Sequence, residues 1–113
     1  MKEIKAIIQP FMVDKVLHAL ACLEDLPGVT VSQVVGWGKG PKGATCDVVH
    51  QGGHAFSRKT KIEIVVTDEV AETVLDTIIE TAHTGRVGDG KVFVLDVAQV
   101  VRVRTGERDH AAL

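Results

Sequence analysis

Two stretches of the chain place an apolar residue at every second position. They cover residues 2–9 and 59–66, and their period of two predicts half-buried β-strands. The alternating apolar positions are Ile4, Ala6, Ile8, Ile62, Ile64 and Val66. Ile7 and Val65 break the rule, because each is apolar on the side that should face water. These two residues indicate that the second face of the sheet forms either a subunit interface or the wall of a pocket.

Helical periodicity appears twice, over about 14–23 and from Thr67 or Asp68 to Ala82. The second helix begins with a capping residue and an acidic first turn, and Gly85 suits its C-terminal stop. Its apolar stripe consists of Ala71, Val74, Leu75, Ile78, Ile79 and Ala82. Runs rich in β-branched residues over 29–37 and 92–101 predict the two remaining strands.

The predicted order is therefore βαββαβ. We expect an α+β fold of the ferredoxin-like type, a four-stranded antiparallel sheet with two helices on one face. Residues 1–113 form a single domain by this prediction. The stretch 38–58 is rich in glycine and lacks periodicity, which predicts a loop of about twenty residues, a length more typical of functional or flexible segments.

Composition limits the partners that this chain can have. A net charge of −2 without a basic stripe argues against nucleic-acid binding. No run of 18 apolar residues is present, so we expect no insertion into a membrane. Cys22 and Cys46 lie far apart and indicate no disulfide framework, and the chain reads as a cytoplasmic, soluble protein.

The glycine-rich run 84–94 is the strongest candidate for chemistry. Three glycines with Arg86 and Lys91 could cradle an oxyanion. Gly85 to Lys91 meets the first part of the Walker A pattern, but Val92 stands where Ser or Thr should hold magnesium, and the run leads into a strand. A Walker NTPase is disfavoured. The run is either another kind of phosphate loop or an ordinary helix-to-strand connection.

Arg102 and Arg104 stand two residues apart near the end of the last predicted strand. In an extended chain both guanidinium groups would leave the same face, which suits bidentate contacts with phosphate. The alternative is a solvated edge where the arginines pair with Glu107 or Asp109.

Common catalytic motifs are absent from the sequence, including G-x-S-x-G, H-E-x-x-H and C-x-x-C, so we expect a protein that is not an enzyme. Within 38–58, Cys46, His50 and His54 recur every four residues. All three are ligand types for Zn or Cu, and they either converge on a metal ion or remain solvated.

With these motifs in hand, the sequence resembles the PII nitrogen-regulatory signal transduction family. The opening from Lys2 to Phe11 is similar to the family's own, and 84–97 and 102–107 match its two C-terminal signatures almost residue for residue. Ala111-Ala112-Leu113 is a typical ending. Only the stretch 38–58 lies outside the resemblance.

The resemblance implies a homotrimer with its sheets facing inward and ATP or ADP bound in the clefts between subunits. Glycines and Lys91 would bind phosphates, and the two arginines would complete each site from its other side. The implied nucleotide-binding positions are Ile7, Gly36, Trp37, Lys39, Val65, Gly88, Asp89, Gly90, Lys91, Arg102 and Arg104. By the same resemblance, the loop 38–58 docks on a target protein, such as a membrane transporter or a metabolic enzyme.

The loop departs from the family pattern. Family members commonly carry Gln after the basic residue, where it helps to hold Mg-ATP and 2-oxoglutarate, but here Lys39 is followed by Gly40. We therefore do not expect 2-oxoglutarate to bind in the usual manner, although Lys59 matches a family lysine that engages it. No tyrosine is present, so the family's covalent switch cannot operate. The alternative function is a metal-responsive trimeric regulator linked to metal efflux, using the Cys46, His50 and His54 set.

Overall fold

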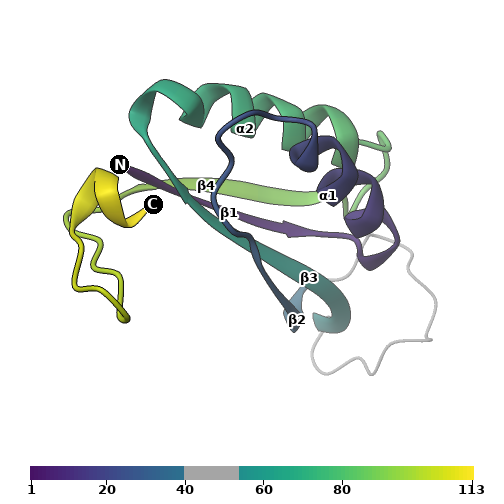
Figure 1. Ribbon diagram of the computed structural model, residues 1–113. Coiled ribbons are helices and arrows are strands. Elements are labelled where there is room, and N and C mark those ends of the chain that lie inside the picture. The colour runs from purple at the N-terminus through teal and green to yellow at the C-terminus, as the bar shows by residue number, and fades with distance from the viewer. Residues whose placement is uncertain (40–53) are drawn as a thin grey trace.

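A computed structural model describes residues 1–39 and 54–113 of the chain. The elements are β1 (Lys2–Ile8), the 3-10 turn η1 (Pro10–Met12), α1 (Val13–Ala21), β2 (Thr30–Lys39), β3 (His54–Val66), α2 (Asp68–Ala82), β4 (Gly90–Asp96) and the 3-10 turn η2 (Asp109–Ala112). The order of the strands and of the two longer helices is the predicted βαββαβ. Both α1 and α2 cover one face of the sheet (Figure 1).

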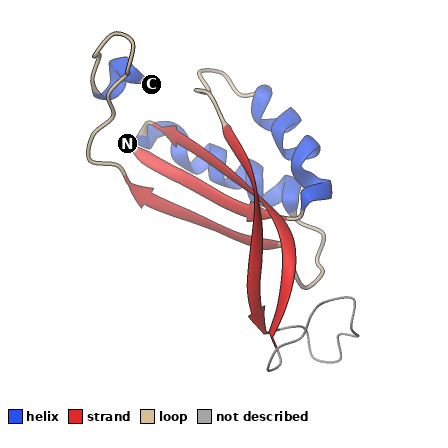
Figure 2. Ribbon diagram, turned by 90° about the horizontal axis from the view of Figure 1, so that it is seen from below, coloured by secondary structure: helices blue, strands red, loops and turns tan. Residues whose placement is uncertain are grey.

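The four strands form one antiparallel sheet in the order β2-β3-β1-β4. This arrangement confirms the ferredoxin-like α+β fold expected from the sequence. β1 pairs with the central strand β3 on one side and with the edge strand β4 on the other, so that Ile7 lies opposite both Lys61 and Lys91. The long β2–β3 hairpin extends beyond the helices (Figure 2).

The core lies between the helices and the covered face of the sheet. Alternate residues of β1 and β3 are fully or nearly fully buried there, together with one stripe from each helix. The central members are Ile4, Ala6, Ile8, Val16, Leu20, Ile62, Ile64, Val66, Val74 and Ile78. Burial of these side chains is the main stabilising contribution, at roughly 25 cal/mol for each Å² of apolar surface removed from water.

The largest differences from the predicted boundaries lie at the β2–β3 hairpin and at the ends of β4 and α1. The hairpin strands run into the expected loop, to Lys39 on one side and from His54 on the other, and residues 40–53 lie outside the described part. β4 ends at Asp96 instead of 101, because the chain turns after it has finished pairing with β1. α1 begins at Val13, directly after η1, and ends at Ala21, two residues earlier than predicted.

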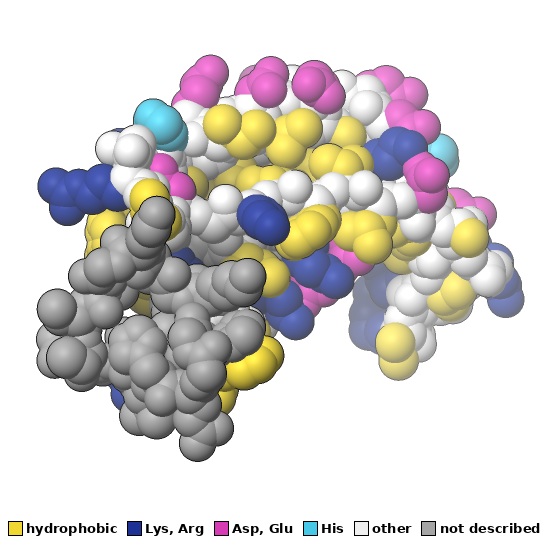
Figure 3. Space-filling model, turned by 180° about the vertical axis from the view of Figure 1, so that it is seen from behind, with side chains coloured by type: hydrophobic (Ala, Val, Ile, Leu, Met, Phe, Trp, Pro, Cys, Tyr) yellow, Lys and Arg dark blue, Asp and Glu magenta, His cyan; other side chains and the backbone are white. Residues whose placement is uncertain are grey.

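The molecular surface separates charge from apolar area. Exposed carboxylates follow the outer side of α2, and apolar side chains lie below them toward the β4 edge (Figure 3). On the uncovered sheet face, Phe93 and Leu95 are 46% and 40% exposed. Within the described ranges, no helix is long and apolar enough to cross a membrane.

Candidate functional site

Asp89 organises the glycine-rich loop between α2 and β4. Its carboxylate accepts hydrogen bonds from the backbone N–H groups of Thr84 and Gly85, at 2.8 and 2.9 Å, and from the Thr84 hydroxyl. The ring nitrogen Nδ1 of His83 lies 3.7 Å from the same carboxylate. In this structure, Asp89 therefore holds the loop together from inside. The sequence placed it among the ligand-binding residues, and its contacts here are with its own loop.

Gly90 starts β4 where two backbones approach very closely. Its φ is +105°, and a Cβ atom at this position would lie 1.8 Å from the carbonyl oxygen of Ile7. Only glycine fits such an approach, which keeps Gly90 in register with Ile8 and places Lys91 opposite Ile7. The glycine thus sets the position of the lysine that follows it.

The carbonyl oxygen of Gly88 ties the loop to β3 and to the residue that follows β1. It accepts a hydrogen bond from Nε2 of Gln9, at 2.8 Å, and another from Nζ of Lys59 on β3. Lys59 is 29 residues away in sequence, so the fold, not a local motif, brings it to the loop. Ile7, Gly88, Gly90, Lys91 and Lys59 therefore form one cluster.

The far end of the β2–β3 hairpin, where β2 ends and β3 begins, carries three more of the predicted residues. Gly36 pairs with Ser57 and Trp37 with Phe56, so Gly36 lies two residue pairs beyond Lys59 along the hairpin. The two aromatic rings are 6.4 Å apart between centroids, and Trp37 is 57% exposed. Lys39 ends β2 opposite His54.

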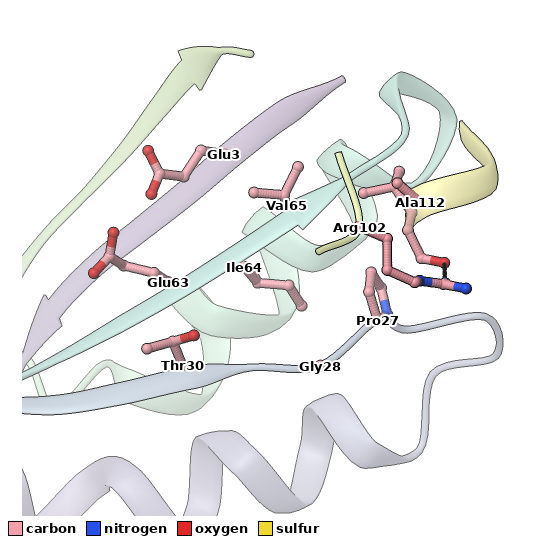
Figure 4. A pocket seen from close by; sticks show the side chains of 10 residues that line it. Glu3, Pro27, Gly28, Thr30, Glu63, Ile64, Val65, Arg102 and Ala112 are labelled. Carbon is pink, nitrogen blue, oxygen red and sulfur yellow. Dashed lines mark hydrogen bonds between the residues drawn. The ribbon is translucent and has the colours of Figure 1, made fainter. Parts of the chain in front are cut away.

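Val65 and Arg102 lie at the other end of the sheet, beside an open pocket of about 670 Å³. Its apolar wall includes Val65 and Ile64, and Figure 4 shows Arg102 beside Pro27 and Ala112 at one end, with Glu3 and Glu63 toward the other. The remaining lining residues are Gly28, Thr30 and Leu113. The pocket thus joins an apolar wall to one cation and two carboxyl groups.

Glu3 and Glu63 lie on the neighbouring strands β1 and β3 and both line this pocket. A hydrogen bond to Glu63, helped by partial burial, raises the pKa of Glu3. The same bond, together with one from Lys61, lowers the pKa of Glu63. Nζ of Lys61 lies 3.3 Å from Oε1 of Glu63. The pair therefore places two carboxyl groups, with Lys61 beside one of them, on the uncovered sheet face.

The two arginines do not extend from a strand, so that prediction was wrong. A bridge between Val101 and Arg108 closes the segment into a turn. Nη1 of Arg102 lies 3.0 Å from Oε1 of Glu107, which is the pairing considered as the alternative from the sequence. Arg104 is exposed on the turn.

Within one chain, the predicted residues form two separate groups. The first group lies at the end of β1, where Ile7 pairs with Lys91. The second group lies near the start of β1, where Glu3 pairs with Val65. Ile7 and Glu3 are four residues apart on β1, which corresponds to roughly 13 Å at the rise of a strand. Lys91 therefore lies beside one end of β1, whereas Arg102 lines the pocket at the other end.

Several residues of these two groups were missed by the sequence prediction. The glycine loop is contacted by Gln9 and Thr84. The pocket at the other end of the sheet is lined by Glu3, Gly28 and Glu63. Glu3 and Glu63 were visible as the polar side of alternating strands, but their pairing needs the strand register. The Gln9 contact depends on tertiary packing and leaves no sequence signal.

The proposed metal ligands are largely beyond the described residues. Cys46 and His50 lie outside them, and His54 is placed only as the first residue of β3. Among residues 1–39 and 54–113, no group of three or more His, Cys, Asp or Glu side chains could hold a metal ion.

Neutralising Asp89 is expected to destabilise the glycine loop in a pH-dependent way. The Thr84 hydroxyl and then the Thr84 backbone N–H lower the pKa of Asp89. Because the folded pKa lies below the unfolded value of about 3.9, this contribution is complete above about pH 4 and is lost as the pH falls through the folded value. Asp89→Asn should therefore lower the melting temperature at pH 7, and the gap to wild type should close at low pH.

The matched control is Asp76→Asn, which removes an exposed carboxylate from α2. Its melting temperature should follow wild type throughout. Thermal unfolding from pH 7 down to pH 3 measures both variants, and a gap for Asp89→Asn that stays constant with pH would contradict the assigned role.

The fold and these contacts define a class: a ferredoxin-like subunit with a glycine-rich loop joined by Lys59 to its β2–β3 hairpin. A family model described as "Nitrogen regulatory protein P-II" matches residues 1–107. The chain belongs to the nitrogen regulatory protein P-II family, whose members are signal-transduction regulators. This confirms the resemblance found in the sequence.

Individual relatives match along the whole chain. It is 52% identical to the nitrogen regulatory protein P-II of Klebsiella oxytoca and 51% identical to nitrogen regulatory protein P-II 1 of Escherichia coli, with 100% of both chains covered in each comparison. A crystal structure of Arabidopsis thaliana PII bound to citrate is similar with a TM-score of 0.78 and 42% identity, covering 99% of this chain and 91% of that one.

Proposed function

We propose that this chain forms a non-catalytic trimeric regulator that binds adenine nucleotides, ATP or ADP, in the clefts between subunits. The pair of Lys59 and Lys91 beside Ile7, next to the glycine loop, carries this proposal. Lys91 lies opposite Ile7 by register, and Nζ of Lys59 donates to the carbonyl oxygen of Gly88. Two cations beside glycine backbone N–H groups suit a polyphosphate.

We also propose that the chain forms a trimer through the uncovered face of the sheet. Ile7, Val65, Phe93 and Leu95 leave apolar area on a sheet face that no element of the described chain covers. Further copies of the chain would bury this area. They would also bring the Arg102 group of one subunit to the Lys91 group of the next, which a single chain does not achieve.

The positions of the Lys91 group and of the Val65 and Arg102 group indicate in which direction the nucleotide would lie. The phosphates would bind at Gly88, Gly90 and Lys91 of one subunit, with Arg102 and Arg104 of its neighbour. The nucleoside would lie toward the neighbour's pocket, where Val65 offers an apolar wall and the carboxyl groups could accept hydrogen bonds from ribose hydroxyls or an exocyclic amine. Trp37 and Gly36 would close the cleft from the hairpin.

Signal output is proposed to pass through the β2–β3 hairpin to a cytoplasmic target, such as a membrane transporter or an enzyme of nitrogen metabolism. Lys59 links the hairpin to the glycine loop through the Gly88 carbonyl. A phosphate bound at the loop either competes with this hydrogen bond or reinforces it. The phosphate can shift the hairpin only if its affinity differs between the conformations with and without this bond. The Arabidopsis relative is described as bound to citrate, so small polycarboxylates are a second anion class to test.

Titration calorimetry of the full chain with ATP, ADP and AMP, with and without Mg²⁺, tests the proposal. We expect heat with ATP or ADP, and roughly 10- to 100-fold weaker binding after Lys91→Ala, from the loss of a charge-assisted hydrogen bond. Lys15→Ala, which removes an exposed lysine from α1, is the control and should bind as wild type. The proposal fails when no adenine nucleotide produces heat or competes at millimolar concentration.

A further inference from the structure

The segment that follows β4 forms a closed turn around Arg102. The backbone N–H of Arg102 donates to the carbonyl oxygen of Glu107, and the N–H of Gly106 donates to the carbonyl oxygen of Arg102, both at 2.8 Å. The bridge between Val101 and Arg108 closes the turn from outside. Arg102 and Glu107 are thus fixed to each other through their backbones.

Their side chains repeat this connection. Nη1 of Arg102 donates to Oε1 of Glu107 at 3.0 Å. The hydroxyl of Thr105 donates to the same oxygen at 2.8 Å and accepts the backbone N–H of Glu107 at 3.2 Å. A second contact joins Nη2 of Arg102 to the backbone oxygen of Leu113 at 3.4 Å. The Glu107 carboxylate is therefore held from two sides and in turn holds the guanidinium group.

This arrangement leaves Arg102 able to bind an anion. A guanidinium group carries five N–H donors, and the contacts with Glu107 and Leu113 leave Nε and further hydrogens for a ligand. The Arg102 and Glu107 side chains are 39% and 43% exposed, so solvent screens the repulsion between Glu107 and an incoming phosphate. The main effect of Glu107 on phosphate binding is therefore to order the Arg102 side chain in advance, because an arginine otherwise loses much rotamer freedom when it binds.

We propose that Glu107 is a positioning residue that orders Arg102 for the phosphates of a bound nucleotide. Thr105 supports it by fixing the carboxylate. This inference rests on the proposed nucleotide site, in which Arg102 approaches the phosphates from the neighbouring subunit. Glu107 itself does not contact the ligand.

The experiment compares ATP, ADP and adenosine on the full trimer by titration calorimetry. Glu107→Ala is expected to weaken ATP and ADP binding roughly three- to tenfold, since Arg102 must then be ordered on binding. Adenosine has no phosphate and should bind as it does to wild type. Glu107→Gln keeps an oxygen that can accept the Nη1 hydrogen bond and should recover most of the loss.

Two controls separate positioning from a general structural effect. Glu80→Ala removes an exposed carboxylate from α2 and should leave all three affinities unchanged. In an Arg102→Ala background, Glu107→Ala should cause no further loss, because the two residues act through the same contact. Thr105→Val should weaken ATP binding in the same direction, and it provides the test where Glu107→Ala does not fold.

The outcomes distinguish this inference from the proposed function. If wild type binds no nucleotide, the proposed function fails. If wild type binds ATP but Glu107→Ala and Thr105→Val bind it equally well, the positioning role is overturned and the nucleotide site stands. An equal loss for adenosine and ATP would also overturn the role, because it would reflect damage to the nucleoside pocket.

Discussion

Gly90→Ala is expected to destabilise the fold by on the order of 4 kcal/mol, a large part of the stability of a domain this size. Two costs add at this residue. Its φ of +105° is one that side chains rarely adopt, and the new Cβ would lie 1.8 Å from the carbonyl oxygen of Ile7. The neighbour is backbone in the centre of the sheet, so relief requires β4 to move away from β1 at the Ile8–Gly90 pair.

Chemical denaturation at fixed protein concentration measures this loss. Gly38→Ala is the matched control, because it places the same methyl group in β2 where, apart from its chain neighbours, no atom of the described residues lies within 4 Å. That variant should stay within about 1 kcal/mol of wild type. A Gly90→Ala protein that unfolds at the same denaturant concentration as Gly38→Ala would show that β1 and β4 do not approach as closely as the structure has them.

The loss would also affect function. Gly90 places Lys91 opposite Ile7, so a shift of β4 moves the lysine away from Gly88 and Lys59. Any folded fraction of Gly90→Ala should therefore bind ATP weakly. This links one backbone position to both stability and ligand affinity.

Elements that bury one face were predictable from the sequence. The alternation over 59–66 and the stripe of α2 reflect burial directly, and Ile62, Ile64 and Ile78 are indeed at most 1% exposed. The ends of the β2–β3 hairpin were not predictable, because they extend beyond the helices and neither face is buried in a regular pattern. Trp37 and Phe56, for example, are both at least half exposed although they lie in strands.

The candidate site was predictable as a set of residue types but not as an arrangement. Glycines and Lys91 identified the loop, because anion cradles need those residues. Its ties to Gln9 and Lys59 join residues far apart in the chain and follow from the strand register. The turn at Arg102 was missed because an apolar run over 92–101 reads as one strand, whereas pairing with β1 ends at Asp96.

Mixed trimers should recover ATP binding that neither parent variant retains. Lys91→Ala and Arg102→Ala chains each form trimers in which every proposed cleft lacks one cation. When both chains assemble together, a cleft is intact wherever the Arg102→Ala chain supplies Lys91 and its neighbour supplies Arg102. Random assembly at equal amounts gives this in roughly a quarter of the clefts, since the interface is heterologous and closes into a ring.

Native mass spectrometry identifies the mixed trimers, and calorimetry counts their tight sites. The control mixes Lys91→Ala with Lys59→Ala, which alter the same side of the cleft, so no cleft regains both lysines. Mixed trimers of Lys91→Ala and Arg102→Ala without recovered binding would contradict an intersubunit site. The roughly 13 Å between Ile7 and Glu3, which mark the two groups on one chain, leads us to expect recovery, because each proposed cleft takes its lysine and its arginine from different subunits.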